Sequence, residues 1–272
     1  MDWSKTKTIF ILAFLVLDIF LAFQYQEKMK SNKYDMITQT TIEEQFKAED
    51  IKYEDLPNEV IEGSYITAKS KQFTEEEIQN LHNQEPMFPN DEQLTPVTKL
   101  RMSFSEPIPL PAETDKMTNK LNQVLTSQIV AGDQYRFWRY DEKTKQVIYL
   151  QEYDGHVIFQ DETDGIGMIV FYLDENREVV SYRQTLLEDI KELENKEELY
   201  TAIQALKVLY DKNDLKSKST VTAVDYGYYT QIPLSEQQIL APTWHIVVNE
   251  QEHYYVNALE GQVIKPEKTN VE

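Results

Sequence analysis

The sequence predicts an α+β protein in which a single N-terminal transmembrane helix is followed by two units, each a helix laid on an antiparallel sheet. Three features carry this prediction. The run Ile9–Phe23 is almost entirely apolar. Two later segments place apolar residues at helical spacing, and each is followed by short alternating segments typical of strands. Helices and antiparallel strands that are grouped in this way along a chain favour the α+β class.

The apolar segment over residues 8–25 has nearly the length of a membrane helix. As a helix it would extend about 27 Å, close to the roughly 30 Å of bilayer hydrocarbon. Trp3 and Tyr25 stand where amphipathic aromatic residues lie at membrane interfaces. The alternatives are a cleaved signal peptide and a buried core helix. The run ends in Ala22-Phe23-Gln24, without the small-residue cleavage pattern of a signal peptide. We therefore expect an uncleaved anchor.

Asp18 is the one acidic residue inside this apolar segment. A carboxylate at the centre of a membrane helix costs about 3 kcal/mol, and such residues usually face another protein segment. At helical spacing the Asp18 face also carries Ile11, Leu15, Ala22 and Tyr25. We predict that these five residues contact a transmembrane partner. The alternative is a lone helix that tolerates Asp18 by protonation and local thinning of the bilayer.

The composition restricts the function. Among 272 residues, Asp and Glu number 47 and Lys and Arg 27, for a formal net charge of -20. Such a field repels nucleic acid, and no nucleic-acid-binding motif is present, so we expect no nucleic-acid partner. Cys is absent, which rules out disulfide bonds, and the seven Gly are too sparse to indicate phosphate-binding loops.

The predicted domain order begins with a cytoplasmic leader over 1–7, a transmembrane helix over 8–25 and a juxtamembrane stalk over 26–40. The first α+β unit is predicted over 41–160. It contains short capped helices that start at Thr41 and Thr74, and a proline-rich stretch over 84–112 that we expect to be irregular apart from one strand. Its further predicted elements are strands at Ser64–Lys69 and Val97–Phe104, a helix at Asp115–Ile129, and strands at Tyr135–Tyr140, Gln146–Leu150 and His156–Gln160.

The second α+β unit is predicted over 161–272. It begins with a hairpin, and a helix over Lys196–Tyr210 precedes further strands. The predicted strands are Ile166–Leu173, Glu178–Thr185, Val221–Thr230, Trp244–Val248, Tyr254–Ala258 and Val263–Ile264. One continuous sheet that spans both halves would also fit the pattern.

No motif for catalysis or for a cofactor stands out. His82, His156, His245 and His253 lack metal-ligand spacing. If Val248 pairs with His253 in a hairpin, His245 pairs near Val256, so the two histidines are not opposite each other. We expect no catalytic residues, metal or cofactor. Common hydrolase motifs are absent.

Aromatic residues cluster in the C-terminal half, at Tyr226, Tyr228, Tyr229, Trp244, Tyr254 and Tyr255. They favour the core of a sheet over the lining of a groove. The chain therefore has the character of an anchored binding or regulatory protein rather than an enzyme.

Two stretches resemble the YycI (WalI) family. The first is Met1-Asp2-Trp3-Ser4-Lys5-Thr6-Lys7-Thr8-Ile9-Phe10-Ile11, leading through Leu17-Asp18-Ile19-Phe20-Leu21. The second is Ala241-Pro242-Thr243-Trp244-His245-Ile246-Val247 with Tyr254-Tyr255-Val256-Asn257-Ala258-Leu259-Glu260-Gly261. The length, the single anchor and the lack of Cys agree with the resemblance, which covers essentially the whole chain.

The resemblance implies a cell-membrane protein of low-GC Gram-positive bacteria that spans the membrane once, with its N-terminus in the cytoplasm and its C-terminal domain outside. It implies that this protein, together with a YycH-like protein, modulates the sensor histidine kinase WalK (YycG) of the two-component system that controls cell-wall metabolism. Contacts between transmembrane helices would carry much of this regulation, and no catalytic residue is transferred.

Two alternatives remain from the sequence. One is an anchored extracytoplasmic domain that binds or inhibits a peptide or cell-wall glycan through an aromatic groove. The other is an anchored hydrolase, which would require converging acids or histidines in a cleft.

Overall fold

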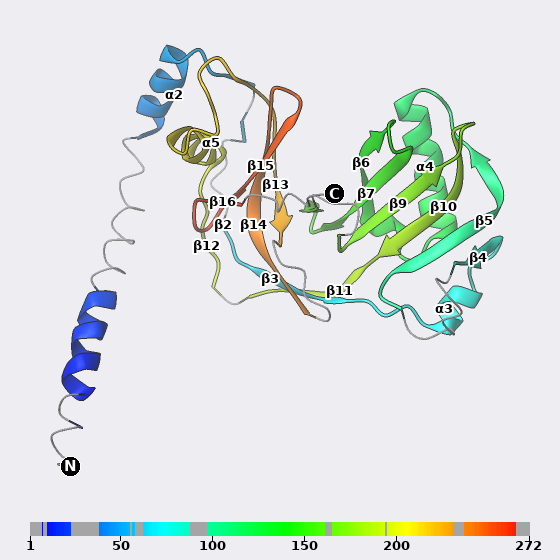
Figure 1. Ribbon diagram of the computed structural model, residues 1–272, viewed down its shortest axis with the longest axis horizontal. Helices are drawn as coiled ribbons and strands as arrows, with labels where there is room; N and C mark the ends of the chain where they lie inside the picture. Colours follow the sequence, from blue (N-terminus) through cyan, green and yellow to red (C-terminus); the bar gives the residue numbers. More distant parts are fainter. Residues whose placement is uncertain are drawn as a thin grey trace, which may run out of the picture. The chain divides into compact units, whose positions relative to one another are not determined.

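The computed structural model describes residues 7, 10–22, 38–54, 56–57, 62–87, 97–160, 165–193, 195–230 and 237–264. The chain divides into two compact units, residues 1–52 with 216–219 and residues 53–215 with 220–272. Helices accompany a large and mostly antiparallel sheet (Figure 1), which confirms the mixed α+β class. Residues 26–37 of the predicted stalk (26–40) and almost all of the leader lie outside the described residues, and residues 38–40 of that stalk belong to a helix.

The first unit contains a helix over residues 10–22 and α2 (Thr38–Ala48). Ile42 and Phe46 lie four residues apart on one face of α2, and both are buried. The main chain after α2 is bonded to a distant segment, because Lys218 N donates to Glu49 O at 2.9 Å. The helix that was predicted to start at Thr41 is present as α2, and it begins three residues earlier, at Thr38.

The second unit holds the remaining elements. Its helices are α3 (Glu75–Gln79), α4 (Thr114–Gln128) and α5 (Ala202–Asp211), with a short 3-10 turn over Gly132–Gln134. Its strands are β2 (Glu62–Gly63), β3 (Ile66–Ser70), β4 (Gln84–Pro86), β5 (Leu100–Pro109), β6 (Tyr135–Asp141), β7 (Gln146–Tyr153), β8 (His156–Phe159), β9 (Met168–Leu173), β10 (Glu178–Thr185), β11 (Leu187–Glu192), β12 (Glu197–Glu198), β13 (Thr220–Tyr229), β14 (Gln237–Val248), β15 (Glu252–Asn257) and β16 (Gln262–Ile264); β1 (Lys52–Tyr53) begins at the unit boundary.

The main sheet follows one hydrogen-bonded path, β11-β3-β14-β13-β8-β7-β9-β10-β5-β4, with β6 beside β7 and with β15 and β16 beyond β14. The pair β8–β13 is parallel, and it connects the strands of the two halves of the sequence. Pairing also crosses the predicted boundary at 160/161, because β9 pairs with β7 and β3 pairs with β14. The two predicted units thus share one sheet, and the division of the chain at 160/161 stays a prediction.

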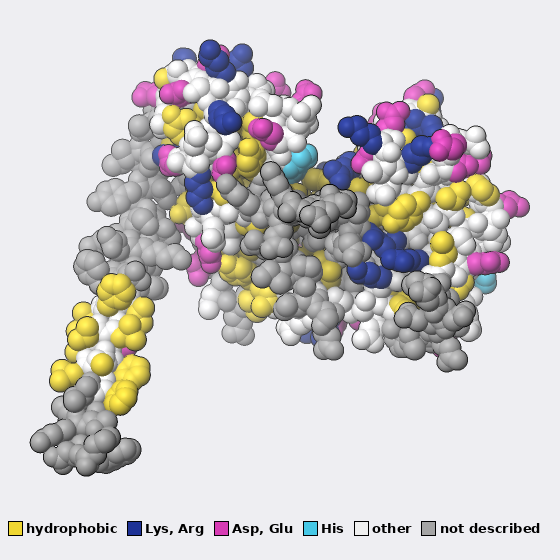
Figure 2. Space-filling view, viewed as in Figure 1, with side chains coloured by type: hydrophobic (Ala, Val, Ile, Leu, Met, Phe, Trp, Pro, Cys, Tyr) yellow, Lys and Arg dark blue, Asp and Glu magenta, His cyan; other side chains and the backbone are white. Residues whose placement is uncertain are grey.

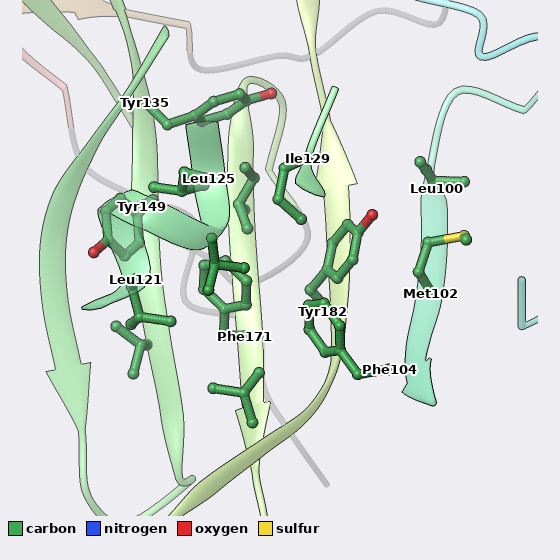
Figure 3. Close-up of a cluster of buried hydrophobic side chains, with 14 of the residues drawn as sticks. Leu100, Met102, Phe104, Leu121, Leu125, Ile129, Tyr135, Tyr149, Phe171 and Tyr182 are labelled. Carbon is green, nitrogen blue, oxygen red and sulfur yellow. The ribbon is translucent and has the colours of Figure 1, made fainter. Parts of the chain in front are cut away.

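Helix α4 covers one face of the strands β6, β7, β9, β10 and β5 (Figures 1 and 3). The helix buries Met117, Leu121, Val124 and Leu125 at the spacing of one helical face. From the sheet, Tyr149, Phe171, Tyr182 and Met102 point toward it and are almost fully buried. The helix predicted over Asp115–Ile129 is thereby confirmed, within one residue at each end.

Helix α5 is shorter than predicted. It begins at Ala202 rather than near Lys196, because the Thr201 side chain accepts a hydrogen bond from Gln204 N and the Gln204 side chain bonds back to Thr201 N. Glu197 and Glu198, which the prediction placed in the helix, pair as β12 with β2. The apolar pattern continues on the N-terminal side of Thr201, but the capping box at Thr201 sets the first residue of α5.

The proline-rich stretch over 84–112 was predicted to be irregular apart from a strand at Val97–Phe104. This is wrong at its start, where Gln84–Pro86 forms β4, and wrong again after Phe104. Strand β5 continues to Pro109 and pairs with β10. The register is interrupted between Val179 and Ser181 of β10, so Pro107 falls in the interruption, where no ladder N–H is required.

Candidate functional site

The N-terminal helix is the sequence-predicted site. Residues 10–22 are helical and every one of them is exposed, with Ile11 at 65% and Leu15 at 50%. Apolar side chains cover most of the helix face that is visible in Figure 2. Ile11, Leu15, Asp18 and Ala22 recur at intervals of three and four residues, which places them on one face of the helix. Tyr25, the fifth predicted contact residue, lies outside the described residues.

Across the described residues, no helix combines the length and the apolar character needed to cross a bilayer.

A pair of histidines that the sequence analysis kept apart is joined in the hairpin of β14 and β15. The observed register pairs Val247 with His253 and His245 with Tyr255, one residue away from the assumed register. His245 and His253 are therefore diagonal neighbours on one face, and Nε2 of His245 lies 2.9 Å from Nδ1 of His253. The length of the turn, which the sequence does not define, decided this contact.

His245 is a buried neutral side chain. The rings of Trp138, Phe159 and Tyr255 each have centroids 5.0 Å from its ring. Burial, together with the charge that His253 can carry, lowers the pKa of His245 to about 3. Its Nδ1 has no hydrogen-bond partner and lies 4.0 Å from Oδ2 of Asp225, a carboxyl whose pKa is raised by burial.

The histidine pair does not extend to a metal site. Among the described residues, no group of three or more His, Cys, Asp or Glu side chains is arranged to hold a metal ion. The aromatic residues nearby are likewise structural, because Trp244, Tyr255, Tyr228 and Tyr229 are buried. The core interpretation of that cluster is confirmed for these four residues.

Two surface cavities of the second unit were not predicted. One, of about 640 Å³, lies between α4 and β6 and is lined by Asn122, Thr126, Asp133 and Phe137 among others. The other, of about 630 Å³, is lined by carboxylates, including those of Glu152, Asp154, Glu188 and Asp189. Both cavities include Glu152 in their lining.

The lining of the acid-lined cavity also includes one positively charged side chain, that of Lys71. Lys71 Nζ lies 2.9 Å from the carboxylate of Glu77 and 3.6 Å from that of Glu188. These two contacts raise the pKa of the Lys71 ammonium, although its partial burial acts against them as the largest single influence. No sequence signal pointed to either cavity, because the lining residues come from distant elements.

These features define an α+β chain with an exposed apolar helix that carries an acid. The family model described as "YycI protein" matches residues 30–259, and the chain therefore belongs to the YycI family. This family consists of membrane-associated regulators, and membership implies a role in regulating the WalK kinase system. The resemblance found in the sequence is thus confirmed.

Other comparisons add little. No curated protein matches the chain. One solved structure, an uncharacterized protein from Eubacterium rectale ATCC 33656, is similar to it with 11% identity and a TM-score of 0.40, over 75% of this chain and 86% of that chain.

Proposed function

We propose that this protein spans the cytoplasmic membrane once, with its N-terminus inside, and regulates the kinase WalK together with a YycH-like protein. Its transmembrane helix contacts partner helices through the face of Ile11, Leu15, Asp18, Ala22 and Tyr25. The domain that follows lies outside the cell. Regulation of this kind requires that the bound helix favours one state of the kinase over the other by differential contacts.

The exposed acid on the apolar helix is the observation that carries the proposal. Apolar side chains that remain exposed over a whole helix are typical of a segment that is covered by lipid or by another protein. In hydrocarbon, a partner that donates a hydrogen bond to Asp18 offsets part of its insertion cost of about 3 kcal/mol. Ala22, four residues on, allows a second helix to approach closely.

Crosslinking in native membranes tests this proposal. A photoreactive residue is placed in turn at each position over 8–25 of the full chain. We expect crosslinks to the kinase or a YycH-like protein to recur on the Asp18 face, and to be weak at Val16 and Phe20 on the opposite face. Crosslinks to lipid alone at every position would refute the contact.

A matched pair of variants measures the contribution of the acid. Asp18→Leu removes the hydrogen-bonding group, whereas Asp18→Asn keeps one. Interhelical hydrogen bonds contribute about 1 kcal/mol, so we expect Asp18→Leu to weaken co-purification with the partner roughly 5-fold and Asp18→Asn to retain most of it. Equal recovery of the partner with Asp18→Leu and the wild type would contradict the role of Asp18.

The cavity between α4 and β6 favours a second function, binding of an extended peptide by the domain that follows the helix. This second function is compatible with the first, because the two use different parts of the chain.

A further inference from the structure

Strand β6 is an edge of the main sheet within the described part of the chain. It pairs with β7 on one side, and no described strand pairs with it on the other. Gln151 N, on β7, donates to Gly167 O on the side of β9, so the alternate residues Leu150 and Ile148 turn their main-chain groups toward β6. Arg136 and Arg139 pair with these two residues, so their main-chain groups point toward β7. Tyr135 and Phe137 therefore turn their main-chain groups outward.

Part of this outward edge is open. The N–H of Tyr135 is used, because it donates to Gly132 O at the end of the 3-10 turn. Among the described residues, no strand pairs with the outward N–H and C=O of Phe137 or with the outward C=O of Tyr135. An edge with unpaired main-chain groups is a template for a further strand. The bulge between Phe137 and Arg139 limits the usable stretch to the first half of β6.

The cavity of about 640 Å³ lies along this open stretch. Helix α4 forms its second wall through Thr118, Asn122 and Thr126, which recur every four residues on one helical face. Leu125 and Phe137 add apolar contacts. The volume falls within the range of ligand sites, roughly 300–1,000 Å³. A groove between an edge strand and a helix suits an extended chain, since the strand supplies hydrogen bonds and the helix supplies side-chain contacts.

The charges along the groove favour a basic occupant. Asp133 lines the cavity and has no ion-pair partner among the described residues. The one nearby cation of the lining, Arg136, already lies 3.3 Å from Glu152. The neighbouring cavity shares Glu152 and adds Asp154 and further carboxylates. A chain with a formal net charge of -20 attracts a cationic segment and repels an acidic one or a second copy of itself.

We propose that the groove between α4 and the open edge of β6 binds an extended segment of a partner protein that contains Lys or Arg. The segment adds a strand beside Phe137, and its basic side chain meets Asp133. This proposal does not depend on the kinase role, because it concerns residues far along the sequence from the N-terminal helix.

The test uses the full chain in detergent and a phage-displayed library of random nine-residue peptides. Enriched peptides are synthesised and their affinity is measured by fluorescence anisotropy. Thr126→Trp fills the groove from an exposed position of α4, and Gln123→Trp places the same ring at an exposed position of α4 that does not line the groove. Peptides N-methylated at alternate positions test the main-chain bonds without any change in the protein, and Asp133→Asn tests the charge.

We expect the selection to enrich peptides that contain Lys or Arg. Their affinity should fall at least 10-fold with Thr126→Trp and with N-methylation, and about 3-fold with Asp133→Asn. Gln123→Trp should leave the affinity unchanged. The proposal is overturned if no peptide is enriched, if the enriched peptides are acidic, or if they bind Thr126→Trp as well as the wild type. Dimerisation of the chain that Thr126→Trp abolishes would assign the groove to a second copy and also overturn it. Binding here and crosslinking at the helix are separate measurements, so either can fail alone.

Discussion

Replacing His245 by phenylalanine should remove a large part of the acid sensitivity of the fold. His245 is 1% exposed and its pKa is lowered to about 3, against an ordinary value near 6.5. The unfolded chain therefore binds a proton between pH 6.5 and 3 that the folded chain does not. Stability is fully present above pH 6.5 and decreases as the pH falls toward 3. At about 1.4 kcal/mol per pH unit, the loss is about 2 kcal/mol between pH 7 and pH 5.

The phenylalanine variant isolates this effect. The new ring is surrounded by Trp138, Phe159 and Tyr255, and it loses only the bond to His253. The carboxyl of Asp225, whose raised pKa acts in the opposite direction, is present in both proteins.

Urea unfolding of the full chain in detergent at pH 7 and pH 5 provides the measurement, with tryptophan fluorescence as the signal. We expect the wild type to lose about 2 kcal/mol more than His245→Phe on acidification. His82→Gln, a change at an exposed histidine, serves as the control and should behave like the wild type. If the wild type and His245→Phe lose equal stability between the two pH values, His245 is not neutral in the folded protein at pH 5.

Three substitutions in the second unit give further tests by urea unfolding. Gln151→Leu should destabilise by about 3 kcal/mol, since the buried Gln151 side chain bonds both the N–H and the C=O of Leu187 at 2.8 Å and each would be left unsatisfied; a loss below 1 kcal/mol would contradict this. Gly132→Ala should cost at least 2 kcal/mol, because a Cβ there would lie 2.0 Å from the carbonyl oxygen of Leu125; wild-type stability would refute the close approach. Thr201→Ala should cost about 1 kcal/mol through loss of the α5 cap, whereas Thr201→Ser should retain most of it.

Local elements were largely predictable because their signals are local. The hairpin strand Glu178–Thr185 is β10 residue for residue, and α4 lies within one residue of its predicted ends. Thr74 forms the predicted capping box with Glu77. The errors arose where two local signals compete, as at Thr201, where a cap overrides an apolar pattern that continues toward the N-terminus.

The groove between α4 and β6 illustrates what no local signal contains. Its walls come from residues near 122 and near 135, and its openness depends on β6 being an edge strand. Edge position depends on the order of strands in the sheet, which is set by long-range pairing. The His245–His253 contact has the same origin, since a shift of one residue in the hairpin would have turned one ring to the other face.

By itself, the sequence determined the family, the α+β class, the strong acidity, the absence of disulfides and the acid within an apolar helix, because each is a property of composition or of neighbouring residues. Only the tertiary structure decided that the two halves share one sheet, that β9 and β10 join the strands under α4, and that β6 is left at an edge. These outcomes depend on which strands exchange hydrogen bonds across long separations, and alternating sequences of similar character do not specify their own partners.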